Sequence, residues 1–303
     1  MNDRKQHVIN KAHQLFIEKG YQATSILDII DFSGISKGTF YNYFSSKNEL
    51  LIAIFTSLSK KIDEERNALL IGHDPADIEI FIQQIELQMA FNHRNKLLTL
   101  FEEVFVSNDP ALKQFLKQTQ ILHIRWTYNR LLDLFGEQKQ PYLLDCAIMF
   151  VGMLHHNIHF HFLANESNGN IRIVIRYTVQ RLIKMVEEIG EAGDRLLDPA
   201  ILEKWLPDCH YSEYAFKKQL YTCVLALKNR LNDDEDQLKY VELLDFILEE
   251  MLHSKKPRKF LVKTTIDSLK NHIGDIASKD LEKLDRIIDH YFDKKESVSQ
   301  PIH

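Results

Sequence analysis

The chain has 303 residues, of which 45% are hydrophobic and 27% are charged, so it is long enough for two or three packed domains. Only 10 glycines and 7 prolines interrupt it, and this scarcity of helix breakers favours an all-α fold. The formal net charge of -5 excludes a protein that coats nucleic acid by charge alone. Any DNA binding must therefore be local.

Cysteine usage and the N-terminus indicate where the protein works. The cysteines Cys146, Cys209 and Cys223 are odd in number, lack metal-ligand spacing and sit among apolar residues, so we expect free thiols in a reducing cytosol. A redox-sensor role for Cys146 is the alternative, although its neighbours give no sign of a lowered thiol pKa. No apolar run is long enough to span a bilayer, and we expect a cytoplasmic protein without membrane contact.

The N-terminal residues predict two helices that pack together. The first covers residues 3–19, and Gly20 ends it. Its inner stripe consists of Val8, Ile9, Ala12, Leu15 and Phe16. A second, short helix follows, in which Ile26, Ile29 and Ile30 recur at helical spacing and form an apolar face.

A tight turn and a two-faced helix come next. In Ser33-Gly34-Ile35-Ser36, Gly34 can close one helix in the left-handed conformation and Ser36 can cap the next one. The following helix, from Lys37 to about Phe44, turns Phe40 and Phe44 inward. Its hydroxyl, amide and ammonium groups point elsewhere, and such groups bond phosphate oxygens and base edges. This arrangement predicts a helix-turn-helix that reads DNA.

The next helix begins at residues 46–49 and continues to about residue 62. Ser46 and Glu49 have the spacing of a capping box, and Lys47 stands at the positive end of the helix, where it suits a phosphate. This helix is the covalent link from the N-terminal helices to the rest of the chain. A small tilt of it would move the helix-turn-helix.

These fifty residues resemble the N-terminal signature of the tetracycline-repressor (TetR) family of bacterial transcription regulators. The matching positions are Gly20, Tyr21, Thr24, Ser25, Ile26, Ile29, Ser33, Gly34, Ile35, Ser36, Gly38, Thr39, Phe40, Tyr41, Tyr43, Phe44, Lys47 and Leu50. Ile30 departs from the pattern, because the family usually has a small residue there. The alternative is a buried helical hairpin whose aromatic residues serve only the core.

The resemblance implies which residues contact DNA. The residues that it assigns to phosphates are Thr24, Ser25, Thr39, Tyr41, Tyr43 and Lys47. Base reading falls to the variable positions Lys37 and Asn42, helped by Tyr41, while Gly38 lets the DNA backbone approach closely.

The middle of the chain predicts a helical body. Asp74-Pro75 is a start signal, and the expected helices cover residues 75–91, 94–106, 110–135, 141–164 and 171–189. In the family, the last two helices of such a set form a four-helix dimer interface. The apolar faces that fit this role comprise Phe150, Val151, Leu154, Ile158, Phe162, Ile175, Val179, Leu182, Ile183 and Val186. The alternative is that both faces belong to the core of one chain.

Two groups of residues in the body are candidates for binding a small effector. His123, Trp126 and Tyr128 combine rings with polar atoms, beside Arg125 and Arg130, which suits an apolar pocket. His155 and His159 lie one turn apart, a spacing that can hold a metal ion, but no carboxylate or thiol stands beside them at helical spacing. We therefore expect pocket or interface histidines, no bound metal and no cofactor.

About a hundred further residues follow, where most members of the family would end. They predict helices over residues 199–206, 211–231, 235–253, 257–272 and 278–294, with a faint internal repeat between 227–231 and 269–273. No phosphate-binding loop, nucleophile elbow or metal motif occurs in this extension. It can thicken a dimer interface, cover an effector pocket or bind another protein.

The sequence thus predicts an all-α protein of three domains: a helix-turn-helix head over 1–47, an effector-binding and dimerisation body over 48–193 and an extra helical domain over 194–303. We expect a homodimer that binds a palindromic operator in double-stranded DNA as a repressor and is released by a small hydrophobic effector. We do not expect an enzyme. The alternatives are a regulator whose extension recruits a protein partner, and a DNA-tethered metal-dependent hydrolase built on the histidines.

Overall fold

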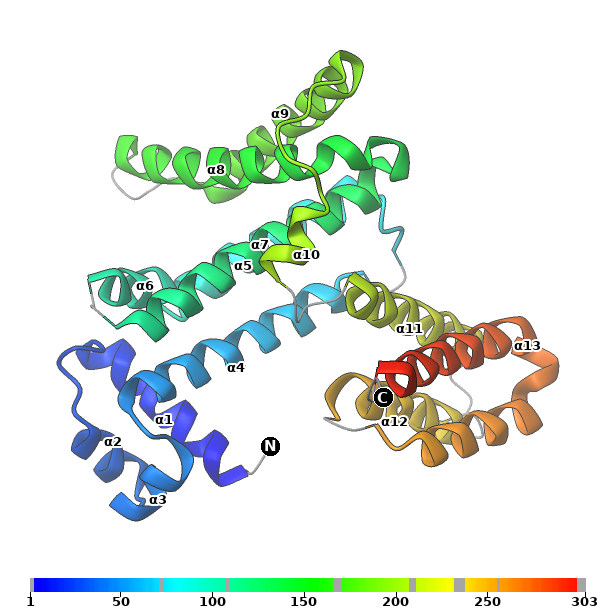
Figure 1. Cartoon of the computed structure of the whole chain (residues 1–303), viewed down its shortest axis with the longest axis horizontal. Helices are drawn as coiled ribbons and strands as arrows, with labels where there is room; N and C mark the ends of the chain where they lie inside the picture. The colour runs from blue at the N-terminus through cyan, green and yellow to red at the C-terminus, as the bar shows by residue number, and fades with distance from the viewer. Residues whose placement is uncertain are drawn as a thin grey trace, which may run out of the picture. The chain divides into compact units, whose positions relative to one another are not determined.

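A computed structural model describes residues 3–70, 73–106, 109–165, 170–206, 211–231, 238–254 and 257–298. All regular secondary structure in these ranges is helical, which confirms the all-α fold. The chain forms two compact units, Met1–Leu206 and Pro207–His303 (Figure 1).

The described residues of the first unit form ten α-helices and one short 3-10 helix. They are α1 (Asp3–Lys19), α2 (Ile26–Ser33), α3 (Lys37–Tyr43), α4 (Lys47–Ala68), α5 (Ile78–Arg94), α6 (Leu97–Val106), α7 (Pro110–Phe135), η1 (Glu137–Lys139), α8 (Gln140–Ala164), α9 (Ile171–Ala192) and α10 (Ile201–Trp205).

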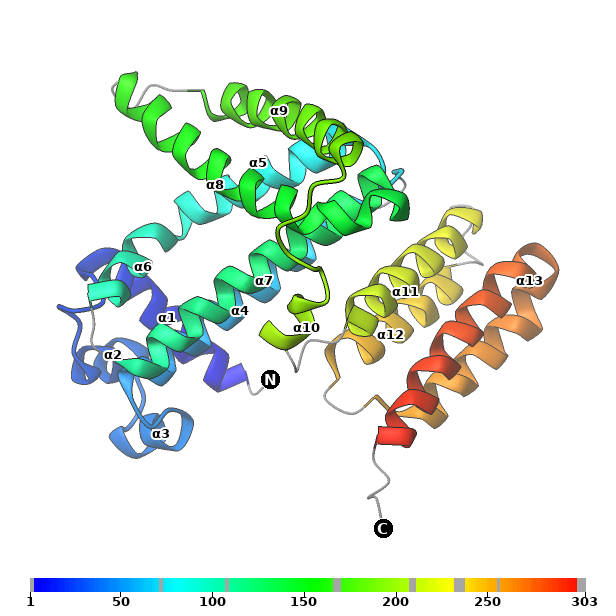
Figure 2. The same ribbon diagram turned by 45° about the horizontal axis from the view of Figure 1, so that its top comes forward.

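The first three helices share one hydrophobic core with α4 and with residues of α5, α6 and α7, among them Phe91, Leu100 and Leu112. Figures 1 and 2 show α1, α2 and α3 grouped at the beginning of α4. The predicted inner stripe of α1 is buried throughout. Phe40 and Phe44 of α3 are also buried, as their spacing predicted. Ile30 is buried in the same core despite its departure from the family pattern, so the larger side chain is accommodated there.

Several predicted helix starts are wrong. α6 begins at Leu97 rather than at Arg94, because α5 continues to Arg94. α5 begins at Ile78 rather than at Pro75, because Asp77 caps it through a bond from the Glu79 N–H, while Asp74 and Pro75 form a preceding turn. Likewise, α10 begins at Ile201 rather than at Pro199. In contrast, α7 begins at Pro110 with Asp109 as its cap, as the sequence predicted. An Asp-Pro pair therefore marks a turn as readily as a helix start.

Helices α8 and α9 pack against each other and against α7 and α5. Most of the apolar residues that were expected at a dimer interface are buried in this core of a single chain, among them Phe150, Leu154, Ile175, Val179 and Leu182. The alternative assignment to the core of one chain is therefore correct for these residues. The outward faces of both helices carry other apolar side chains.

The second unit contains α11 (Tyr211–Arg230), α12 (Leu238–His253) and α13 (Lys259–Val298), which pack around their own core. α13 is interrupted at Ala277, whose φ of -140° is not helical, so it forms two arms where two helices were predicted. Cys223 is buried in this core and Cys146 in that of the first unit, both as free thiols, and burial raises each thiol pKa to about 11. Cys209 and Glu166 lie outside the described residues.

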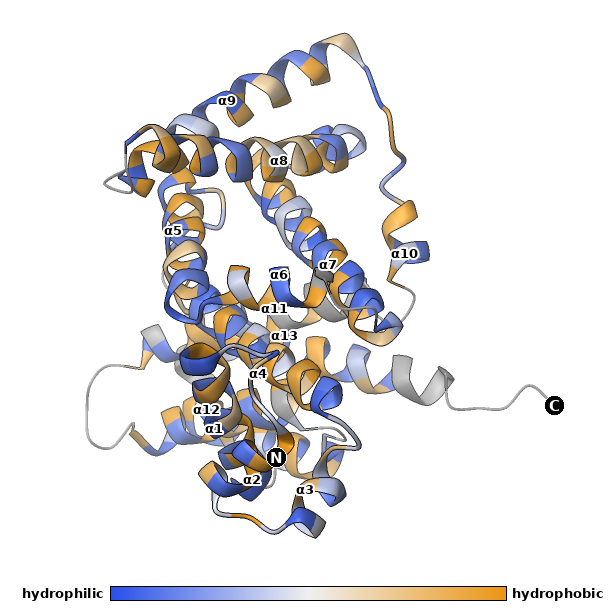
Figure 3. Cartoon of the chain, turned by 90° about the vertical axis from the view of Figure 1, so that its left-hand side faces the viewer, coloured by the Kyte–Doolittle hydropathy of each residue, from blue (hydrophilic) through white to orange (hydrophobic). Residues whose placement is uncertain are grey.

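Polar and apolar residues alternate along the helices (Figure 3). Within the described ranges, we find no helix with both the length and the apolar character that crossing a bilayer requires.

Candidate nucleic-acid interface

The turn between α2 and α3 has the predicted geometry. Gly34 has φ 65° and closes α2, with its N–H directed to the carbonyls of Asp31 and Ile30. The Ser36 hydroxyl oxygen accepts the Thr39 N–H at 3.1 Å and so caps α3. Since both ends of the turn are fixed by local hydrogen bonds, the orientation of α3 is set within the head itself.

The polar face of α3 is turned to solvent. Lys37, Gly38, Tyr41 and Asn42 are exposed, and the Tyr41 side chain is 47% exposed although it contacts Phe40 edge-on. An ammonium, a phenol hydroxyl and an amide therefore project together from a short helix whose other face, at Phe40, is anchored in the core. These are groups that bond phosphates and base edges.

Two of the α3 residues assigned to phosphates are partly buried. The Thr39 hydroxyl lies 2.9 Å from the Ser36 hydroxyl, and the Tyr43 ring packs against the core of the head. Each keeps part of its side chain accessible. Their assignment to DNA remains a prediction.

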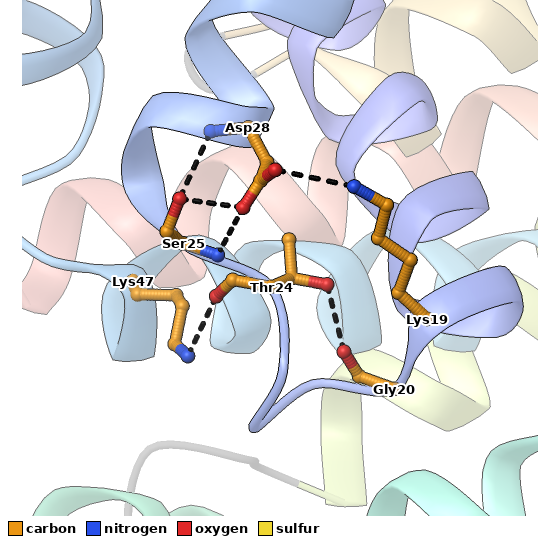
Figure 4. Close-up of polar contacts among 6 residues, drawn as sticks. All are labelled: Lys19, Gly20, Thr24, Ser25, Asp28 and Lys47. Atoms are coloured by element: carbon orange, nitrogen blue, oxygen red, sulfur yellow. Dashed lines mark hydrogen bonds and ion pairs between the residues drawn. The ribbon is translucent and has the colours of Figure 1, made fainter.

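The turn before α2 uses its polar side chains internally (Figure 4). Thr24 is buried, and its hydroxyl donates to the Gly20 carbonyl at 2.7 Å. Ser25 and Asp28 form a complete capping box, in which the Ser25 N–H donates to Asp28 Oδ2 at 2.8 Å and the Asp28 N–H donates to Ser25 Oγ at 3.1 Å. A phosphate contact from either hydroxyl would require an existing bond to be exchanged.

Lys47 also has internal partners. Its ammonium donates to the Tyr21 and Thr24 carbonyls, each at 2.9 Å, and lies 4.3 Å from the centre of the Tyr21 ring. Desolvation by burial lowers its pKa, against an opposing effect of Glu103. Lys47 thereby ties the start of α4 to the turn before α2, and one of its three N–H donors is left for a phosphate.

The capping box predicted at the start of α4 forms only in part. The Ser46 hydroxyl oxygen accepts the Glu49 N–H at 3.1 Å. The Glu49 carboxylate, however, accepts the N–H and hydroxyl of Ser45, each at 2.7 Å, instead of the Ser46 N–H. The hydrogen bonds of Ser45 lower the pKa of Glu49.

Contacts between the head and the body involve residues that sequence reasoning did not identify. Glu103 of α6 accepts the Gln22 N–H at 2.9 Å, and Asn48 of α4 joins the Tyr21 hydroxyl to the Asp109 carboxylate at the start of α7. Burial, Asp109 and Glu103 raise the pKa of Tyr21 to about 12. No local pattern signals these contacts, because they join residues more than twenty positions apart.

Comparison with known proteins agrees with this geometry. The family model described as "Bacterial regulatory proteins, tetR family" matches residues 8–54, which contain α2, the turn and α3. The chain belongs to the TetR family. It is a DNA-binding transcriptional regulator with a helix-turn-helix.

Two relatives match this TetR-family regulator almost from end to end. It is 27% identical over 295 residues to the uncharacterized HTH-type transcriptional regulator YerO of Bacillus subtilis (strain 168), covering 95% of this chain and 96% of the relative. It is 24% identical over 302 residues to the uncharacterized HTH-type transcriptional regulator YuxN of the same organism, covering 94% of this chain and 97% of the relative. Both are therefore similar to it beyond the head, through the C-terminal part.

A third relative matches the head alone. This is the HTH-type transcriptional repressor DhaR of Mycobacterium sp. (strain GP1), 36% identical over 62 residues, which cover 19% of this chain and 31% of the relative. No solved structure matches the chain at a significant level.

The residues expected in an effector pocket of this TetR-family protein fall into two groups. Trp126 and Tyr128 of α7 are buried, and the partly buried His123 stacks on Trp126 with 6.1 Å between ring centres. Burial, with a smaller effect of Arg66, lowers the pKa of His123 to about 4. His155 and His159, in contrast, are exposed on α8. The five residues are thus not enclosed together.

The histidines of α8 contact aromatic neighbours on their own helix. His155 lies edge-on to His156, and His159 lies edge-on to Phe160. Within the described ranges, they belong to no group of three or more His, Cys, Asp or Glu side chains placed to hold a metal ion.

Proposed function

We propose that the protein is a homodimeric repressor that binds a two-fold symmetric operator and is released from it by a small effector. The observation that carries the DNA-reading part is the exposed polar face of α3, fixed by Gly34 and Ser36 on one side and anchored by Phe40 on the other. Lys37 and Asn42 read bases, and Tyr41 contacts a phosphate.

The head alone carries little excess positive charge. Its basic and acidic residues up to position 54 are Arg4, Lys5, Lys11, Lys19, Lys37 and Lys47 against Asp3, Glu18, Asp28, Asp31 and Glu49. Since phosphate neutralisation supplies much of the affinity for DNA, a single head of this charge binds weakly. Two heads on one operator would add their contacts, which favours a dimer.

The outward faces of α8 and α9 supply a surface for dimerisation. On α8, Met149, Phe160 and Leu163 are 39%, 59% and 68% exposed, and on α9, Ile173 and Tyr177 are 60% and 55% exposed. A Cβ at Gly152, between Met149 and the histidines, would meet nothing within 4 Å. Apolar side chains that recur on the same faces of two adjacent helices suit packing against a second copy.

The effector would act through the contacts between head and body. Glu103 and Asp109, at the end of α6 and the start of α7, hold the turn before α2 and the start of α4. A ligand that shifts α7 would move these carboxylates and change the spacing of two heads. The relative DhaR, whose head is similar, is described as a repressor, which supports the same sign of regulation here.

Light scattering and footprinting test this proposal together. We expect a particle of about twice the 35.6 kDa chain mass, protecting two half-sites about one helical turn apart in DNA upstream of its own gene. Leu163→Glu places a charge in the α8 surface and should give a monomer. The matched control Leu122→Glu, on the exposed face of α7, should remain a dimer. A wild-type monomer that protects one half-site would contradict the proposal.

A further inference from the structure

A buried cation and a buried amide lie one turn apart on α7. Arg125 and Asn129 are only 6% and 3% exposed, and their i, i+4 spacing places them on the same face of the helix. The short helix α10 packs against α7, and its Glu203 reaches Arg125.

The hydrogen bonding of this pair is incomplete. Arg125 Nη2 donates to Glu203 Oε1 at 3.2 Å, but its Nη1, although buried, has no hydrogen-bond partner among the described residues. Asn129 Oδ1 is likewise buried and has no donor within the part of the chain that the structure describes. Each is an exception to the rule that buried polar groups are paired, and together they present one donor and one acceptor on one helix face.

The partner of Arg125 is itself loosely held. The Glu203 side chain is 49% exposed, whereas that of Arg125 is 7% exposed, so the carboxylate keeps much of its contact with water while the guanidinium has lost it. α10 has five residues and no side-chain cap. One exposed partner offsets little of the free energy that is lost when a guanidinium is buried. A second anion, itself shielded from water, would bind this guanidinium more strongly than Glu203 does.

The surroundings of the pair are apolar. α10 contributes the buried Leu202 and the partly buried Trp205 to the core around α7, to which Trp126 also belongs. The Arg66 guanidinium also lies there, 4.0 Å from the centre of the Trp126 ring. A ligand reaching Arg125 from under α10 therefore meets a charged anchor within an apolar environment. This combination recognises a molecule with an anionic group on an apolar body.

We infer that Arg125 anchors an amphipathic carboxylate as the effector and that Glu203 is an internal carboxylate that occupies the anchor until the effector displaces it. Asn129 Oδ1 accepts a hydrogen bond from a donor on the ligand or from water that enters with it. The inference rests on the proposed ligand-responsive function and names the chemistry of its effector. Displacement of Glu203 frees α10 from α7. Asp109, the N-cap residue of α7, accepts a hydrogen bond from Asn48 at the start of α4, and Asn48 in turn bonds Tyr21 of the head.

The tryptophans of this chain make the site observable. There are only two, Trp126 on α7 and Trp205 on α10, and both belong to the core around the site. The experiment titrates the full-length protein with octanoate and, in parallel, with octanol, and follows intrinsic fluorescence. Octanoate should give a saturable change with at least about tenfold higher affinity than octanol, because the carboxylate forms charge-assisted bonds. Repeating the titration with Trp205→Phe assigns the remaining signal to Trp126.

Three variants sharpen the test. Glu203→Gln removes the competing charge and should bind octanoate about threefold or more tightly, a gain that only a folded protein shows. Arg125→Gln should weaken octanoate binding at least about tenfold and leave octanol binding unchanged. Lys204→Gln, on the exposed side of α10, is the matched control and should behave as wild type.

Equal affinity for octanoate and octanol, or unchanged octanoate binding in both Glu203→Gln and Arg125→Gln, would overturn the assignment. A separate measurement of operator release distinguishes the two proposals. Octanoate that binds at Arg125 but leaves the protein on its operator supports the site and contradicts the ligand-responsive function. Release by octanol alone supports that function and contradicts the site.

Discussion

The head and the middle of α7 both carry many polar side chains, but they use them differently. In the head, Ser25, Asp28 and Ser36 bond backbone groups of their own turns, and Lys37, Tyr41 and Asn42 of α3 face solvent. On α7, Arg125 and Asn129 are buried with bonds unmade. In the head, the buried Ser33 hydroxyl has no partner among the described residues, but the charged and amide groups that face DNA in our proposal are either exposed or bonded. On α7 a charged group is itself buried with a bond unmade, as the proposed response to a ligand requires.

The largest expected effect concerns the anchoring of α3. Phe40→Ala empties a fully buried position and should lower the free energy of unfolding by about 3–5 kcal/mol. Hydrogen exchange of the α3 amides, measured at several urea concentrations, reports the loss. Phe32→Ala, on the exposed face of α2, is the control and should cost less than about 1 kcal/mol. Equal losses of stability in Phe40→Ala and Phe32→Ala would contradict the claim that Phe40 anchors α3.

The next effect separates the roles on the polar face of α3. Tyr41→Ala removes the proposed phosphate contact and should weaken binding to all DNA sequences by roughly 1 kcal/mol. Asn42→Ala should instead reduce discrimination at one base pair by about 1–3 kcal/mol. Binding to a set of operators with single base changes measures both. If both variants lost the same affinity for every operator, this division into a phosphate contact and a base contact would be contradicted.

Two smaller effects on stability allow a direct comparison of the head with the middle of α7. Ser25→Ala removes the cap of α2 and should destabilise the head by about 1 kcal/mol. Asn129→Leu removes a buried carbonyl oxygen without a described donor and should change stability by less than about 1 kcal/mol, in either direction. Chemical denaturation of the two variants measures both values. A large loss from Asn129→Leu would show that its amide stabilises the fold, and the contrast between the regions would fail.

The smallest effect is a dependence on pH. The hydroxyl and N–H of Ser25, with Lys19, lower the pKa of Asp28 to about 2 from its ordinary 3.8. Because the folded pKa is the lower one, the stabilisation is complete above about pH 4 and is lost as the pH falls toward 2. In acid titrations followed by circular dichroism, Asp28→Asn should lose this part of the pH dependence. Ser25→Ala, which removes the first cause, should reduce it, and an unchanged profile in both would contradict the assignment.

Local patterns predicted the head well and the body less well, for a physical reason. Gly34, Ser36 and Asp109 act on residues within a turn of themselves, so their roles can be read from adjacent positions. Asp74-Pro75 failed because Asp77, three residues later, offered a competing cap.

The orientation of α8 and α9 could not be predicted in this way. Leu154 and Leu163 are both apolar residues of α8, yet the first is buried and the second is exposed. Only packing against α7 and α9 decides between them. The contacts of Glu203 with Arg125 and of Asp109 with Asn48 likewise depend on the tertiary fold and have no signature in the sequence.

The most direct test of the account is fluorescence anisotropy of operator DNA across a salt series, with wild type and Tyr41→Ala. For a dimer that places two α3 helices on DNA, the logarithm of the affinity should fall steeply with the logarithm of the salt concentration, by about 0.9 per phosphate contacted. Tyr41→Ala should weaken binding at every salt concentration. Binding that is insensitive both to salt and to Tyr41→Ala would contradict the claim that the exposed face of α3 holds the DNA.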